Sequence, residues 1–122
     1  MVSLILCLLF LQVKHVIIDY VLQTQDQIHR KGTYGDWVGF THSLQHGIGT
    51  LGVVAIFGRD LSPLLFIGIP VLDTILHYNI DWTKMNFGCK DMSNKLFWWH
   101  LGIDQFAHQV TYLFIAFAII SQ

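Results

Sequence analysis

Four long apolar stretches occupy almost the whole chain of 122 residues. Each is close to the length of about 20 mostly apolar residues with which an α-helix crosses a membrane. Hydrophobic residues make up 53% of the chain and charged residues only 12%, against roughly 25% charged residues in an ordinary soluble domain. The stretches are residues 2–23, 36–58, 62–80 and 95–121. The sequence therefore predicts an all-α integral membrane four-helix bundle, with four transmembrane helices in a single domain over residues 1–122.

The connections between the stretches carry signals for the start of a helix. Asp36 is suited to be the N-cap of the second helix, and either Ser93 or Asn94 can cap the fourth. Before the third helix, Ser62 is followed by Pro63, a proline at the first helical position. Because only a few residues separate the second and third stretches, we expect these two helices to form a tight antiparallel hairpin. We expect the third helix to end near residue 80 and a loop of residues 81–95 to follow it.

Basic residues are distributed unevenly among the connections. Short cytoplasmic loops of membrane proteins are enriched in lysine and arginine. The second connection has only Arg59, whereas five basic residues lie in or beside the first and third: Arg30, Lys31, Lys84, Lys90 and Lys95. The asymmetry predicts that both termini lie outside the cytoplasm.

Composition and cysteine placement exclude two function classes. A formal net charge of -1 with seven basic residues provides no basic surface for nucleic acid. Cys7 and Cys89 lie at different heights in this topology and form no Cys-x-x-Cys pair, so we expect neither a disulfide nor thiol redox chemistry. The expected partners are membrane lipids and, in a homo-oligomer, further copies of the chain.

Each apolar stretch contains ionisable side chains of metal-binding types, spaced four residues apart. Residues at this interval lie on one face of an α-helix. Inside a membrane such side chains are costly, and they usually face the bundle interior and carry function. Nine residues form this pattern: His15 and Asp19 in the first stretch, His42 and His46 in the second, Asp73, His77 and Asp81 in the third, and Asp104 and His108 in the fourth.

The depths of the four clusters overlap. A rise of about 1.5 Å per residue from the predicted cytoplasmic ends places them roughly 5 to 20 Å into the membrane. Side chains from different helices can share an ion only at a similar depth. We therefore expect one site in the cytoplasmic half of the bundle.

Imidazole and carboxylate ligands together suit a divalent transition metal, with zinc favoured and iron or manganese as alternatives. Nine candidates are enough for two ions, or for one ion and a shell of carboxylates that orients its histidines. Asp73 and Asp81 are the candidate catalytic residues, with Asp73 as a base or a further ligand. The predicted metal ligands are His15, Asp19, His42, His46, His77, Asp81, Asp104 and His108.

Two other interpretations of these residues remain open at this point. The pairs can be interhelical hydrogen bonds that hold the bundle together. Two facing histidines can also ligate haem, although haem leaves the aspartates unexplained. The nearby string Gly47-Ile-Gly-Thr-Leu-Gly52 matches a nucleotide-binding pattern, but no strand precedes it, and it indicates close helix packing instead.

The candidate ligands belong to longer motifs. These are H-V-I-I-D-Y-V-L-Q-T at 15–24, H-x-x-x-H at 42–46, H-Y-N-I-D at 77–81 and D-Q-F-A-H at 104–108. The motifs resemble those of the bacterial and phage membrane family called domain of unknown function 3307 (DUF3307), with Tyr20 where phenylalanine is usual. The resemblance covers nearly the whole chain. It implies the membrane architecture and the site positions, in a bacterial inner membrane or in a phage-encoded protein, but no activity.

A shorter motif, T-H-S-L at 41–44, is similar to one in membrane-bound metal-dependent hydrolases, and this similarity implies hydrolysis. The leading hypothesis is a hydrolase that acts on a lipid-linked or membrane-accessible ester or phosphoester. The alternatives are a metal-ion or proton transporter, in which the clusters are stations along a pathway, an iron-dependent membrane oxidoreductase, and a non-enzymatic membrane subunit.

Overall fold

The computed structural model describes residues 1–121, and all its regular elements in this range are helices. The all-α prediction is therefore confirmed. The elements are α1 (Val2–Val16), the π-helical segment η1 (Ile17–Leu22), α2 (Gln25–Arg30), α3 (Trp37–Phe57), α4 (Pro63–Phe87) and α5 (Lys95–Ile120). Since η1 continues α1 without a break, the chain has four long helical segments and one short helix.

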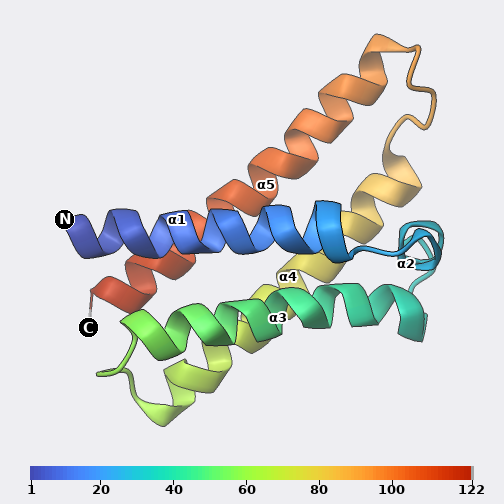
Figure 1. The fold of residues 1–122 in the computed structure, drawn as a ribbon. Helices are drawn as coiled ribbons and strands as arrows, with labels where there is room; N and C mark the ends of the chain where they lie inside the picture. The colour runs from blue at the N-terminus through green and yellow to red at the C-terminus, as the bar shows by residue number, and fades with distance from the viewer. Residues whose placement is uncertain (122) are drawn as a thin grey trace.

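The four long segments run alternately in opposite directions (Figure 1). The segment α1–η1 packs against α3 and α5, and α4 also packs against α3 and α5, which closes a four-helix bundle. Both termini lie at one end of the bundle together with the α3–α4 connection. The short α2 and the α4–α5 connection lie at the opposite end, which we call the α2 end (Figure 1).

The distribution of polarity is the reverse of that in a soluble protein. Large apolar side chains such as Ile5, Phe10 and Phe114 are exposed, whereas lysines, histidines and aspartates are buried in the bundle. Most of the buried apolar side chains, among them Leu11 and Val54, form one cluster. An apolar exterior with ionisable groups inside is the arrangement expected of a membrane bundle.

Three helical segments among residues 1–121 are long and apolar enough to cross a membrane: Val2–Leu22, Pro63–Phe87 and Lys95–Ile120. Helix α3 has 21 residues, as Val2–Leu22 does. The mean hydropathy of its most apolar stretch is lower than that of the other three, because histidines and other polar residues lie in its first half. Three of the four predicted spans are therefore supported by hydropathy.

The predicted helix starts agree with the structure. The side chain of Asp36 accepts hydrogen bonds from the first turn of α3, and that of Ser62 accepts one from the first turn of α4, where Pro63 occupies the start of the helix. Of the two candidates before α5, Asn94 is the N-cap and Ser93 is not. The hairpin of α3 and α4 is thus short and antiparallel, as expected.

The end of α4 differs from the prediction. The helix continues to Phe87, so the predicted loop of residues 81–95 is wrong over its first seven residues. The apolar pattern fades near residue 80, but backbone hydrogen bonds continue a helix without it. The helix ends at Gly88, whose N–H donates to the carbonyl of Lys84 at 2.8 Å.

The first connection also contains a helix that was not expected. Thr24 accepts a hydrogen bond from the backbone of Gln27, and the Gln27 side chain accepts one from the backbone of Thr24. This reciprocal capping box starts α2. The spacing of threonine and glutamine was the sequence signal for it.

Helices α3 and α4 approach closely at Gly47. A Cβ atom there would collide with Oγ1 of Thr74 and lie 2.9 Å from the carbonyl oxygen of Pro70. At Gly52, one and a half turns further along α3, a Cβ would meet no atom within 4 Å. The close packing inferred from the glycine string is therefore confirmed at Gly47 and does not extend to Gly52.

Candidate metal centre

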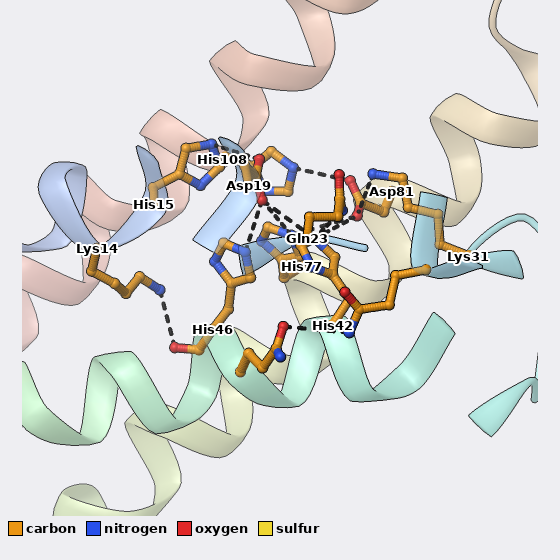
Figure 2. A network of polar contacts seen from close by, with 12 residues as sticks. Lys14, His15, Asp19, Gln23, Lys31, His42, His46, His77, Asp81 and His108 are labelled. Carbon is orange, nitrogen blue, oxygen red and sulfur yellow. Dashed lines mark hydrogen bonds and ion pairs between the residues drawn. The ribbon is translucent and has the colours of Figure 1, made fainter. Parts of the chain in front are cut away.

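The predicted ligands converge inside the bundle. Figure 2 shows the histidine side chains directed toward one another around Asp19 of η1 and Asp81 of α4. Two sets have ligand atoms within 4.8 Å of one another. The first group is Asp19, His42, His46 and His77, and the second group is His77, Asp81 and His108.

Several separations within the first group are close to those of a tetrahedral metal site. The Nε2 atoms of His46, His42 and His77 lie 2.9, 3.3 and 3.9 Å from Oδ1 of Asp19. The Nε2 atoms of His42 and His77 are 3.3 Å apart. Four ligands about 2.0–2.1 Å from a tetrahedral zinc ion lie about 3.3 Å from one another. The residues present therefore fit one ion.

The facing nitrogens of His42 and His77 add a chemical argument. A neutral imidazole has one N–H and one lone pair, so two facing nitrogens form a hydrogen bond only when one of them is protonated. A metal ion accepts the lone pairs of both. The Nδ1 atoms of both histidines are buried and have no hydrogen-bond partner in the described structure.

The second group is centred on Asp81. Its Oδ2 lies 3.5 Å from Nε2 of His77, and its Oδ1 lies 3.5 Å from Nε2 of His108. The buried Nε2 of His108 has no hydrogen-bond partner within residues 1–121. Nζ of Lys31 donates to Oδ2 of Asp81 at 3.1 Å. Three protein ligands leave a coordination position open, as catalytic zinc sites do.

Both groups contain His77, so the two candidate positions are adjacent. One imidazole nitrogen binds one ion. Two ions would need both ring nitrogens of His77, or a carboxylate of Asp19 or Asp81 that bridges through its two oxygens. The arrangement accommodates one ion or two.

Two predicted ligands lie beside the groups without belonging to either. Nε2 of His15 is 3.2 Å from Oδ2 of Asp19, while its Nδ1 is 2.8 Å from the hydroxyl of Tyr112. Oδ1 of Asp104 lies 3.7 Å from Nε2 of His108 and has no hydrogen-bond partner in the part of the chain described. These two side chains are positioned to orient ligands rather than to complete a group.

Asp73 lies apart from both groups. Its Oδ2 accepts hydrogen bonds from Nζ of Lys14 at 2.6 Å and from the hydroxyl of Thr50 at 2.6 Å. The structure therefore places this candidate base in a separate buried ion pair.

Lys14, for which the sequence predicted no role, also lies beside the first group. Its Nζ also donates to the carbonyl of His46 at 3.1 Å and lies 4.6 Å above the ring of Tyr112. Tyr112 in turn places its hydroxyl 3.4 Å from Nδ1 of His46. The signal for Lys14 was a lysine in the middle of an apolar stretch, directly before His15.

The π-helical segment η1 places two side chains at the site. It contains Asp19 and ends at Gln23, whose backbone is extended with φ −65° and ψ 124°. The amide nitrogen of Gln23 lies 2.8 Å from Nε2 of His42. Amide nitrogen and oxygen are interchangeable by a rotation of the group, so Gln23 can present an oxygen ligand there. Short π-helical turns are frequent at functional sites.

The bundle and its buried histidines and aspartates define a class of membrane-type helical proteins with a candidate metal centre. Within that class, the chain belongs to the family described as protein of unknown function (DUF3307), whose model matches residues 5–122. No curated protein and no solved structure matched the chain. The similarity to membrane-bound metal-dependent hydrolases stays a prediction.

Proposed function

We propose that this protein is an integral membrane metalloprotein that hydrolyses a lipid-linked or membrane-accessible ester or phosphoester. The observation that carries the proposal is the first group, whose four ligand atoms from η1, α3 and α4 lie within 4.8 Å of one another, with several separations close to those of a tetrahedral site. The adjacent second group, with its three ligands, favours a reactive centre over a closed structural site.

The residues of the site have three different roles in the proposed reaction. His42, His46 and His77 hold a divalent ion, for which zinc fits the tetrahedral spacing best. The ion would act as a Lewis acid that polarises an ester or phosphoryl oxygen and activates water. Asp81 is a ligand or a base, and the ammonium of Lys31 beside it offers positive charge to an anionic substrate. Asp73 is engaged by Lys14 and has no part in the proposed reaction.

Metal analysis tests the proposal most directly. Protein purified in detergent, stripped with a chelator and reloaded with zinc should retain at least one ion per chain. The double variant His42→Gln/His46→Gln should lose the ion of the first group and so contain less zinc, while His29→Gln, an exposed histidine of α2, should behave as the wild type. Equal zinc content in the wild type and the double variant would contradict the metal site.

Hydrolysis is tested on the reloaded protein. A chromogenic carboxylic ester and a chromogenic phosphoester should show at least one turnover that stops on chelation and returns with zinc. If the protein binds metal but turns over neither probe nor a lipid substrate, the metal site is supported and the hydrolase activity is contradicted.

Transport is the second candidate, and a specific observation favours it. Buried polar side chains continue beyond the two groups to the ion pair of Lys14 and Asp73 and the hydroxyl of Thr50. Such chains of ionisable groups serve as pathways in transporters. Zinc uptake or proton flux in proteoliposomes would support this function, and a hydrolase should show neither.

We also propose that α3 is a fourth span and that both termini lie outside the cytoplasm of a bacterial inner membrane. The alternating helix directions and the two termini at one end of the bundle support an even number of crossings (Figure 1). Reporter fusions at each terminus test this topology. A reporter that is active only in the periplasm should be active at both termini.

A further inference from the structure

An apolar groove of about 450 Å³ lies between the C-terminal half of α4 and the N-terminal half of α5. Its walls include Leu76, Ile80, Ile103 and Ala107. Both helices are long and apolar enough to cross a membrane. The groove therefore has the lining and the position to take a hydrocarbon chain from the bilayer.

One end of this groove carries hydrogen-bond donors. Lys84 and His100 line it there. Nδ1 of His100 accepts the backbone N–H of Cys89 at 2.7 Å, so the proton of the neutral ring is on Nε2. An ammonium and an imidazole N–H are a suitable pair for a phosphate group.

The polar end of the groove lies at the level expected for the membrane surface. It lies at the α2 end of the bundle, near the α4–α5 connection (Figure 1). Trp98 and Trp99 are exposed near the start of α5, as aromatic side chains at membrane interfaces are. A lipid in the groove would thus have its headgroup at the level of Lys84 and its chain toward the bilayer centre.

Asp104 connects the groove to the candidate metal centre. It lines the groove, and its Oδ1 is buried, unpartnered within residues 1–121 and 3.7 Å from Nε2 of His108. Buried carboxylate oxygens are normally paired with a hydrogen-bond donor, and a ligand in the groove could provide one. A headgroup hydroxyl supplies one, whereas a phosphate oxygen would be repelled.

We propose that the groove between α4 and α5 binds an anionic glycerophospholipid with free headgroup hydroxyls, such as phosphatidylglycerol. The phosphate contacts Lys84 and His100, a hydroxyl donates to Asp104, and an acyl chain lies against Ile103 and Ala107. This inference rests on the proposed function in that it names the substrate class and its route to the second group.

Lipid retention tests the inference. The protein is placed in nanodiscs of phosphatidylcholine with a minor fraction of phosphatidylglycerol. It is then released from the nanodiscs, and the lipids that stay bound to it are counted by native mass spectrometry. The wild type should retain phosphatidylglycerol in preference to phosphatidylcholine. Lys84→Gln should lower this preference about tenfold, because a hydrogen bond to a charged group is lost, and Lys84→Arg should restore most of it.

Two further variants complete the design. Lys90→Gln removes the same charge from an exposed loop position outside the groove and should leave lipid retention unchanged. Ala107→Phe fills the groove and should displace the lipid. Equal retention in Lys84→Gln and Lys90→Gln, or undiminished retention in Ala107→Phe, would overturn the inference.

Zinc content and helicity measured on the same samples separate this inference from the proposed function. Zinc binding without phosphatidylglycerol preference in the wild type overturns the lipid site and retains the metal site. Phosphatidylglycerol preference that depends on Lys84 in a protein without zinc retains the lipid site and rejects the metal-dependent hydrolase.

Discussion

The imidazole of His46 in α3 stacks on that of His77 in α4, with ring centroids 3.5 Å apart and ring planes 19° apart. Two protonated imidazoles at this distance would repel each other strongly in a buried environment. The stack is therefore suited to neutral rings, which is the state in which imidazole binds metal. It also holds both Nε2 atoms near Oδ1 of Asp19.

The shared position of His77 predicts how metal content responds to single substitutions. His46→Gln should impair only the first group, and His108→Gln only the second. His77→Gln should impair both, because His77 belongs to both. The measurement is zinc per chain by elemental analysis after equilibration at fixed free zinc.

The control for this series is His100→Gln, which changes a histidine of α5 outside both groups. It should retain the zinc content of the wild type. If His108→Gln lowers zinc content as much as His77→Gln does, the two groups act as one site and the separation fails. If His77→Gln retains full zinc content, the assignment of His77 as a ligand shared by both groups is wrong.

Tyr112 should affect metal affinity without touching the metal. Its hydroxyl contacts Nδ1 of His15 at 2.8 Å and Nδ1 of His46 at 3.4 Å. Partners of this kind orient ligand histidines, and their loss typically costs about 10- to 100-fold in metal affinity. Tyr112→Phe should weaken zinc binding by this factor in competition with a chromophoric chelator. Tyr20→Phe, an exposed tyrosine of η1, should not; equal affinities of the two variants would refute the orienting role.

The pairing of the candidate ligands was predictable from sequence because helical spacing and depth restrict it. His42 and His46 share a face of α3 and lie at the depth of His15 and Asp19, and the structure brings them together. The separate cap at Asp36 followed from local rules in the same way.

The separation of Asp73 from the groups was not predictable from spacing alone. Four residues turn a helix by about 400°, so each step of four moves a side chain about 40° around the axis. Asp73 and Asp81 are two such steps apart. Asp73 faces Lys14, whereas Asp81 faces Lys31 and His108. Which of them reaches the histidines depends on how α4 is rotated in the bundle, and a period of four does not specify that rotation.

The buried pair of Lys14 and Asp73 predicts a strong stability effect with a characteristic pattern. Nζ of Lys14 lies 2.6 Å from Oδ2 of Asp73, and both side chains are almost fully buried. Removing one partner leaves an uncompensated buried charge, at a cost of about 3–5 kcal/mol. Lys14→Met and Asp73→Asn should each lower the free energy of unfolding in detergent by about this amount, from that same imbalance.

The double variant distinguishes an ion pair from two independent sites. Lys14→Met/Asp73→Asn removes both charges and should be more stable than either single variant, since neither partner is left unpaired. Additive losses in the double variant would mean that the two charges do not stabilise each other.

Gly47 and Gly52, two of the glycines of α3, provide a matched pair for the last prediction. A methyl group at Gly47 collides with Thr74 and comes 2.9 Å from the carbonyl oxygen of Pro70, whereas at Gly52 it meets nothing within 4 Å. The carbonyl oxygen belongs to the backbone of α4, so relief at Gly47 requires the two helices to separate. Overpacking of this kind costs about 1–3 kcal/mol or more. Replacing glycine by alanine in an unobstructed helix is favourable by about 1 kcal/mol.

Gly47→Ala should therefore lower the thermal unfolding midpoint in detergent, and Gly52→Ala should leave it unchanged or raise it. Because α3 carries His42 and His46 and α4 carries His77, separation of the two helices should also weaken zinc binding by the first group. Gly52→Ala should bind zinc as the wild type does. If Gly47→Ala matches Gly52→Ala in both measurements, the close approach of α3 and α4 does not hold the first group together.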